Sequence, residues 1–157
     1  MSVPTLLQVV VLFVAALATG ALMVNWIGLA RAMMRLSSAS AYVEFHQAST
    51  RTFDPYMPIL VIGAMLGGGV LAALSKGLQT PPGELAVIGA LCYAAVLSIS
   101  LSTNVRLNKL VARWQIHSPP PSWAAIRAKW VRFHILRTLI SVPALLSYLF
   151  AVVLTCG

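Results

Sequence analysis

The feature that most constrains this chain is a set of four long segments without a charged side chain. Residues 1–30, 55–75, 85–105 and 138–157 contain no Asp, Glu, Lys or Arg. Because an α-helix rises about 1.5 Å per residue, each segment is long enough to cross roughly 30 Å of hydrocarbon. The runs are continuously apolar and do not alternate, which excludes a transmembrane β-barrel. The sequence therefore predicts an all-α integral membrane four-helix bundle.

The composition agrees with a bilayer environment. Of the 157 residues, 59% are hydrophobic and 9% are charged, which excludes a soluble globular domain, a disordered chain and a disulfide-stabilised secreted module. Cys92 and Cys156 lie far apart in apolar stretches without a CxxC spacing. We expect both to be small buried side chains, and neither a redox motif nor a disulfide.

A single membrane domain, residues 1–157, accounts for the whole chain, because its longest polar stretch is too short for a soluble domain. The first apolar segment lacks the basic beginning of a secretory signal, so we treat it as mature structure. Spanning helices are expected at about 5–31, 56–76, 84–108 and 122–155, with an amphipathic helix in the membrane interface at about 38–53.

The basic residues are distributed very unevenly. Segments 31–54 and 106–137 hold ten of the eleven Lys and Arg residues, whereas the 76–84 connection holds only Lys76 and Glu84. The positive-inside rule places the basic segments in the cytoplasm and both termini outside. We therefore expect a multi-pass protein of the plasma membrane. The excess of basic residues follows from this topology and does not indicate nucleic-acid binding.

The fourth predicted helix carries a polar stripe that points into the bundle. At 100° per residue, an arc of about 80° holds Trp123, Arg127, Trp130, His134, Arg137 and Ser141. Lys129 and Arg132 fall on the opposite side, where they face water or lipid phosphates. Ionisable groups that point into a membrane bundle are costly to bury, so this stripe indicates a functional site.

Other segments bring polar residues to the same end of the bundle. One face of the interfacial helix holds Tyr42, Phe45, His46, Ser49 and Phe53, and the other holds Glu44, Gln47 and Arg51. This helix is expected to end at Asp54-Pro55, because proline disfavours helical geometry at the residue before it. Asn104 and Asn108 share a face of the third helix, and Asn25 lies near the same depth on the first.

The second spanning segment contains the spacing Gly63-x-x-x-Gly67. Small residues four apart allow two membrane helices to approach closely. We expect this face to pack against a neighbouring helix and to offer a contact for a homo-oligomer.

Several of these motifs together resemble a known family. The motifs are Asn25-Trp26, Tyr42-Val-Glu-Phe-His46, Arg51-Thr-Phe-Asp54-Pro55, Asn104-Val-Arg-Leu-Asn108 and the run W-x-x-x-R-x-x-W-x-x-x-H-x-x-R from Trp123 to Arg137. Over nearly its whole length the chain resembles the small four-helix membrane proteins of the anthrone-oxygenase-like family. Many members have no assigned biochemistry. Those with a named role are taken to oxidise anthrone-type polyketide intermediates to anthraquinones with dioxygen, without an evident cofactor.

The resemblance implies a cofactor-independent monooxygenase whose apolar aromatic substrate arrives from the bilayer. A neutral histidine would remove a proton from the acidic methylene, and arginines would stabilise the resulting oxyanion. The implied catalytic residues are His134, Arg137, Arg127 and His46. The implied substrate-binding residues are Asn25, Asn104, Asn108, Trp123, Trp130 and Tyr42.

Two other classes of function fit the same residues. His46 and His134 are candidate axial ligands of a b-type haem, with the arginines on its propionates. A non-enzymatic membrane interaction protein needs only the basic rim and the glycine face. A non-haem metal site is disfavoured, because the chain has only three acids and Glu44 falls opposite His46 on the helical wheel.

Overall fold

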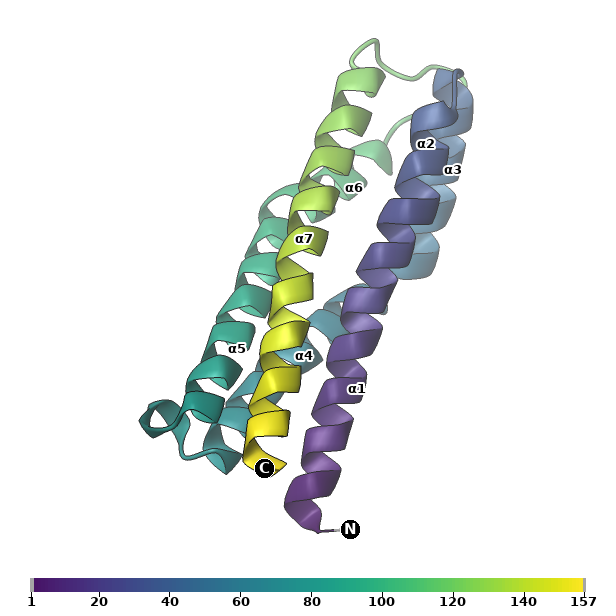
Figure 1. Ribbon diagram of the computed structural model, residues 1–157. Coiled ribbons are helices and arrows are strands. Elements are labelled where there is room, and N and C mark those ends of the chain that lie inside the picture. Colours follow the sequence, from purple (N-terminus) through teal and green to yellow (C-terminus); the bar gives the residue numbers. More distant parts are fainter. Residues whose placement is uncertain (1, 157) are drawn as a thin grey trace.

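The computed structural model of the protein describes residues 2–156, apart from the side chain of Cys156. The expectation for Cys156 therefore lies outside the described residues. Within the described part the chain is helical and contains no strand. Its helices form one elongated bundle with both ends of the chain at the same end, as Figure 1 shows.

Four long helical rods build the bundle. The first rod is continuous through α1 (Val3–Val24), the π-helical turn η1 (Asn25–Ala30) and α2 (Arg31–Arg35). The second consists of α3 (Ala39–Phe53) and α4 (Met57–Leu74), with a break between them. The third runs through α5 (Pro81–Ile99), the π-helical turn η3 (Ser100–Asn104) and α6 (Val105–Val111), and the fourth is α7 (Trp123–Cys156). A short 3₁₀ turn, η2 (Gly77–Gln79), precedes α5.

Four helical segments are long and apolar enough to cross a membrane. They are Val3–Arg35, Met57–Leu74, Pro81–Val111 and Trp123–Thr155. This confirms the predicted all-α architecture with four spanning helices. Two of the segments, the first and the third, extend a few residues beyond the bounds expected from the sequence, because helical geometry continues past the apolar run.

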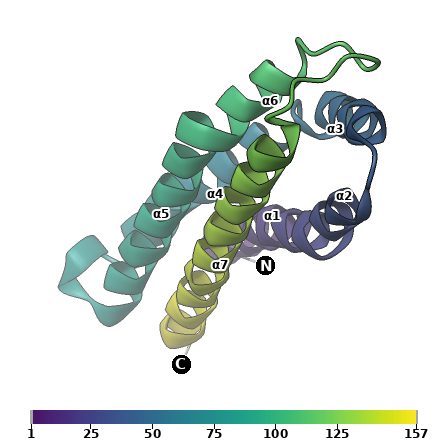
Figure 2. The same cartoon turned by 90° about the horizontal axis from the view of Figure 1, so that it is seen from above.

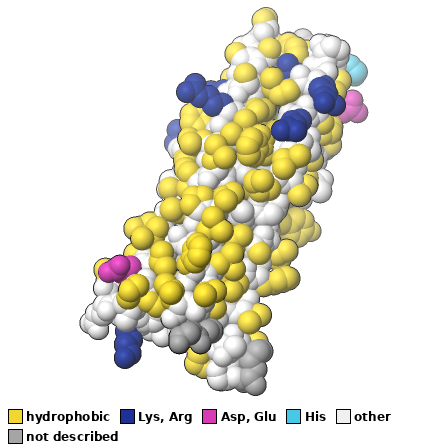
Figure 3. Space-filling model, viewed as in Figure 1, with side chains coloured by type: hydrophobic (Ala, Val, Ile, Leu, Met, Phe, Trp, Pro, Cys, Tyr) yellow, Lys and Arg dark blue, Asp and Glu magenta, His cyan; other side chains and the backbone are white. Residues whose placement is uncertain are grey.

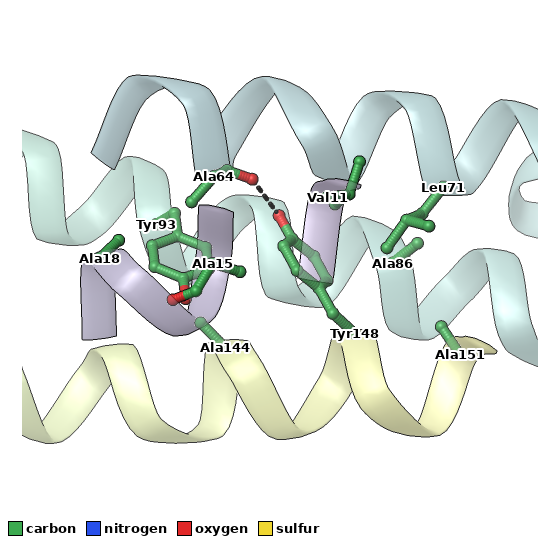
Figure 4. Close-up of a cluster of buried hydrophobic side chains, with 10 residues drawn as sticks. All are labelled: Val11, Ala15, Ala18, Ala64, Leu71, Ala86, Tyr93, Ala144, Tyr148 and Ala151. Carbon is green, nitrogen blue, oxygen red and sulfur yellow. Dashed lines mark hydrogen bonds between the residues drawn. The ribbon is translucent and has the colours of Figure 1, made fainter. Parts of the chain in front are cut away.

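The helices meet in a ring. α1 packs on α4 and α7, and α5 packs on the same two helices from the other side. The core at the end near the termini is built of small residues and two tyrosines. Tyr148 donates a hydrogen bond to the carbonyl oxygen of Ala64 at 2.9 Å, and the Tyr93 ring lies 5.6 Å from that of Tyr148 (Figure 4). Both hydroxyls have partners, as burial in an apolar interior requires.

The glycines of the second rod serve packing within the chain. A Cβ at Gly63 would lie 3.1 Å from Val14, and one at Gly67 would lie 2.7 Å from Val11. The expected close approach therefore occurs between α4 and α1. The same contact makes the predicted oligomer surface wrong in its location, because α1 covers the Gly63 and Gly67 face and leaves no room there for a second copy.

The position of α3 differs from the one expected. It does not lie across the end of the bundle in the interface plane but runs back beside α2, as Figures 1 and 2 show from two directions. It also contacts α6. Gln47, expected on the outer face, points inward and donates hydrogen bonds of 3.0 Å to the carbonyl oxygens of Val111 and Trp114. These bonds join α3 to the backbone at the end of α6.

The break in the second rod lies where the sequence predicts it, because α3 ends at Phe53, but the geometry of Asp54 differs from the one expected. Asp54 keeps helical geometry, with φ −58° and ψ −34°, and its N–H donates to the carbonyl oxygen of Thr50. The expectation that Pro55 would push Asp54 out of helical geometry is therefore wrong. Pro55 acts instead by lacking the N–H that would continue the helical bonds, so the turn falls on residues 54–56.

Charge is concentrated at the ends of the bundle. In the view of Figure 3 apolar side chains cover the middle, and most of the visible Lys and Arg side chains gather at the end that holds α2, α3 and α6. Lys76 and Glu84 lie at the opposite end, around the α4–α5 connection. This distribution is that of a protein whose middle lies in hydrocarbon.

Candidate functional site

A cavity of about 210 Å³ lies where the second rod is interrupted. All four rods contribute to its wall, which is mainly apolar, with Leu29, Met33, Phe53, Val61 and Leu97 among the lining residues. Eight residues with polar side chains also line it: Asn25, Ser49, Thr50, Asp54, Ser100, Asn104, Asn108 and Arg137. An apolar cavity with a few convergent polar groups is the usual form of a small-molecule site.

Both π-helical turns border the cavity. Asn25 begins η1, and Ser100 and Asn104 begin and end η3. A π-helical turn inserts an extra residue into an α-helix and changes the direction of the side chains that follow it, which is why such turns often occur at functional sites. Here the two turns carry polar side chains that line the cavity.

Arg137 is the only Lys or Arg side chain that lines this cavity among the described residues, and it is 8% exposed. Its Nη1 donates to Ser100 Oγ at 2.9 Å. Its Nε and Nη2 lie 3.1 and 2.8 Å from Nδ1 of His134, which accepts from them. The remaining guanidinium hydrogens are available to a molecule in the cavity.

His134 holds Arg137 from behind the cavity wall. The His134 ring is fully buried and stacks on Trp130, with ring centres 5.1 Å apart and planes 6° from parallel. Its Nε2 lies 3.2 Å from the carbonyl oxygen of Leu22, an acceptor, so Nε2 carries the proton. Nδ1 is then the unprotonated nitrogen that accepts from Arg137. Both ring nitrogens are thus occupied, and His134 does not line the cavity.

Asn108 connects three side chains around the cavity. Its Nδ2 donates to the two carboxylate oxygens of Asp54 at 3.1 and 3.3 Å. Its Oδ1 accepts from Trp130 Nε1 at 2.7 Å and from His46 Nε2 at 3.1 Å. This arrangement fixes the proton of His46 on Nε2 and leaves Nδ1 buried without a partner in the described structure. Asn108 therefore orients the Asp54 carboxylate at the cavity.

The environment shifts the ionisation of the groups on α3 and at its end. Burial raises the pKa of Asp54, and the Asn108 hydrogen bond and the charge of Arg137 oppose that shift. Burial lowers the pKa of His46 to about 4, so this imidazole is neutral at physiological pH. Burial also raises the pKa of Tyr42 to about 12, against the charge of Arg127. Because its pKa is raised, the Asp54 carboxylate accepts a proton more readily than an ordinary aspartate.

Arg127 lies in a second cluster, away from the cavity. Its Nη1 donates to the carbonyl oxygens of Met33 and Leu36, at 2.9 and 2.7 Å, where α2 ends. The guanidinium carbon lies 4.6 Å from the Trp123 ring centre and 5.8 Å from that of Tyr42. These contacts hold the α2–α3 turn against the start of α7.

The inward stripe of α7 is present as the helical wheel predicts, since Trp130, His134, Arg137 and Ser141 are buried and Lys129 and Arg132 are exposed. The predicted site residues nevertheless divide into two groups. Those that line the cavity are Asn25, Asn104, Asn108, Trp130 and Arg137. Those that do not line it are His46, His134, Arg127, Trp123 and Tyr42.

Asp54 is the functional candidate that the sequence reasoning missed. The Asp54-Pro55 pair predicts the end of a helix and belongs to one of the motifs shared with the family, but it gives Asp54 no role in the site. A signal was available, because Asp54 is one of just three acids in the chain and the other two, Glu44 and Glu84, face outward. Asp54 lines the cavity and is itself an exposed residue, so it stands at the cavity mouth.

The histidines do not fit axial ligation of a haem. Both ring nitrogens of His134 hydrogen-bond within the protein, and Nε2 of His46 bonds to Asn108. The Trp130 ring contacts both imidazoles, at 5.1 and 5.4 Å between centres, and neither histidine faces the cavity. Among the side chains of residues 2–155, no group of three His, Cys, Asp or Glu lies close enough together to hold a metal ion.

Comparison with known proteins shows the family of the chain. No curated protein and no solved structure matches the chain. The family model of anthrone oxygenase matches residues 45–147. This region is well over half of the chain, and it includes the break in the second rod, residues 104–108 and the polar stripe through Arg137. The chain belongs to the anthrone oxygenase family.

Proposed function

We propose that the protein is a membrane oxygenase that uses dioxygen to convert the acidic methylene of an anthrone-type aromatic molecule to a carbonyl. The observation that carries this proposal is the cavity at the broken rod, where an apolar wall holds one carboxylate, Asp54, and one guanidinium, Arg137, on different rods. Asp54 accepts from Asn108 and Arg137 donates to Ser100, and neither group bonds to the other. The carboxylate therefore keeps acceptor positions, and the guanidinium keeps N–H groups, for a substrate. Family membership supports the same reaction class.

In the first step the Asp54 carboxylate removes a proton from the methylene carbon. The electron pair of the broken C–H bond delocalises onto the ring carbonyl oxygen and gives a phenolate-like anion. Arg137 stabilises that oxygen through its free N–H groups, as a preorganised donor in a water-poor site does. Asp54 suits the role of base because burial raises the pKa of its carboxyl group.

In the second step dioxygen takes one electron from the carbanion, and the resulting superoxide joins the carbon radical to form a C–O bond. The peroxide takes up the proton held by Asp54. Removal of the remaining C–H proton by Asp54 then breaks the O–O bond, forms the C=O bond and releases hydroxide, which becomes water with that proton. One CH₂ group and one O₂ thus give one C=O group and one H₂O.

Other lining residues supply positioning in this proposal. Asn25 Oδ1 is buried without a partner in the described residues and is an acceptor for a phenolic hydroxyl of the substrate. Trp130 offers an aromatic surface for a flat ring. His134 acts by positioning Arg137. We also place the basic end in the cytoplasm and the protein in the plasma membrane, following the positive-inside rule.

The test is substrate-dependent oxygen uptake by the purified, detergent-solubilised protein, with anthrone as the probe and the rate without protein subtracted. Asp54→Asn preserves the shape of the side chain and an acceptor for Asn108 but removes the base. We expect its rate to fall about 100-fold or more. Formation of anthraquinone is followed in parallel by its absorbance.

Glu44→Gln is the matched control, because Glu44 is an exposed acid on the same helix and does not line the cavity. We expect this variant to keep the full rate. An unchanged rate in Asp54→Asn, or no acceleration over the protein-free reaction by the natural sequence, would contradict the proposed function.

A further inference from the structure

A second hollow lies on the outside of the bundle, between the first rod and α7. It measures about 300 Å³ and is lined by Trp26, Ala30, Arg31, Met34, Arg35, Val131 and Ile135. None of these residues lines the cavity at the broken rod. The groove is therefore independent of the proposed reaction.

The two arginines of this groove are exposed and lie four residues apart on one face of α2. Like charges at this spacing repel one another. The acids of the chain lie elsewhere, with Asp54 at the cavity, Glu44 on the outer face of α3 and Glu84 at the opposite end. An anion from outside the protein would relieve the repulsion, and guanidinium pairs bind phosphate oxygens well.

The depth of the groove indicates the kind of anion. Arg31 is the first charged residue of the chain, so it stands where the apolar part of the first rod ends. That level corresponds to the lipid headgroups. The remaining walls are apolar, with Ala30 buried and Val131 and Ile135 half-buried. A ligand with a phosphate at one end and a hydrocarbon chain at the other matches both parts.

We propose that the groove formed by Arg31, Arg35, Val131 and Ile135 binds an anionic phospholipid, with its phosphate on the two guanidiniums and an acyl chain against α7. The phospholipid would lie along the seam between the first rod and α7 and tie them together. This binding differs from general attraction to a charged surface, because it requires these two arginines and no others.

The experiment measures lipid binding to the full chain in mild detergent by native mass spectrometry. Phosphatidylglycerol is compared with phosphatidylcholine of the same acyl chains, on the natural sequence and on the double variant Arg31→Gln/Arg35→Gln. We expect the natural sequence to prefer phosphatidylglycerol, and the double variant to bind it about tenfold or more weakly. Each single variant should lose part of that affinity, which keeps the test valid if the double variant folds poorly.

The control is Arg51→Gln/Arg113→Gln, which removes two exposed arginines at the same end of the bundle but outside the groove. It should bind phosphatidylglycerol like the natural sequence. Glycerol 3-phosphate, added in excess, distinguishes a free phosphate from a lipid headgroup and should not displace the lipid. Equal binding of the two lipids, an equal loss in the control, or displacement by glycerol 3-phosphate would each overturn the proposal.

Discussion

At the scale of single residues, the role of each polar group at the cavity depends on which of its donors and acceptors have no partner within the protein. Arg137 retains N–H groups beyond those given to Ser100 and His134. His134 has no free nitrogen, because Leu22 and Arg137 occupy both. Of the titratable side chains around the cavity, Asp54 is the one with both a raised pKa and an open position at the cavity mouth. In the proposed reaction the carboxylate is therefore the group that accepts the proton.

The pH dependence of the rate separates Asp54 from His134. Because only the carboxylate accepts a proton, the rate should rise with pH through one ionisation above the usual carboxyl range. His134→Asn keeps an acceptor for Arg137, but the acceptor atom lies at a slightly different position, so the guanidinium shifts. We expect this variant to lose up to about 100-fold in rate with an unchanged pH profile. Oxygen uptake is measured from about pH 4 to about pH 9. Loss of the ionisation in His134→Asn would identify the imidazole as the base instead.

His46 should make stability depend on pH. Burial lowers its pKa to about 4 from 6.5, so between these values the unfolded chain binds a proton that the folded chain does not. Stability should therefore fall by about 2–3 kcal/mol as pH decreases from 6.5 to 4. The raised pKa of Asp54 acts in the opposite direction, since protonation then favours the folded state.

His46→Gln isolates this contribution, because it removes the titrating ring and supplies an amide N–H as a donor to Asn108 in its place. Thermal unfolding in detergent should show a weaker pH dependence for the variant than for the natural sequence over the same range. Identical dependence in the two proteins would mean that His46 titrates normally in the folded state.

Half of the site residues predicted from the sequence line the cavity, and Asp54 lines it without having been predicted. The helical wheel predicts which side of α7 faces inward, and that holds for Trp130, His134 and Arg137. It does not predict which inward residue meets a cavity and which meets a backbone carbonyl. Arg127 is the clearest case, because the carbonyls it binds belong to α2, far away in the sequence.

At the scale of helices, the cavity exists because the second rod is broken and its two halves are offset. α3 packs beside α2 and α6, whereas α4 packs between α1 and α5. The apolar runs were sufficient to predict the four spans. They were not sufficient to predict this offset or the two π-helical turns, because both depend on tertiary contacts that leave no periodic signal in the sequence.

The tight packing of α4 makes a matched pair of glycines informative. A Cβ at Gly68 would lie 2.6 Å from Cβ of Ala90 and would also collide with the Tyr148 hydroxyl, whereas a Cβ at Gly69 meets nothing within 4 Å. Gly68→Ala should destabilise the protein by about 1–3 kcal/mol through overpacking. Gly69→Ala should be neutral or stabilise it by up to about 1 kcal/mol through helix propensity.

Thermal unfolding of the two variants in the same detergent checks this packing. A lower melting temperature for Gly68→Ala alone is the expected result. Equal melting temperatures for both variants would show that α4 does not pack against α5 and α7 as described.

At the scale of the whole molecule, the polar residues converge at one end of the bundle, and small residues and tyrosines fill the other. The position of the cavity near the basic end places it at the level where an apolar molecule from the bilayer meets polar groups. A reaction on an apolar, acidic carbon benefits from this position, since the substrate is concentrated in lipid and its anion is stabilised by a fixed guanidinium.

The most direct test of this account is the position of a bound product, determined in a crystal structure with anthraquinone. We predict a flat ring in the cavity at the broken rod, in contact with Trp130 and with one carbonyl oxygen within hydrogen-bonding distance of Arg137. Asp54 should face the opposite carbonyl. The account would be contradicted if anthraquinone bound against Tyr42, Trp123 and Arg127 and no anthraquinone lay between Asp54 and Arg137.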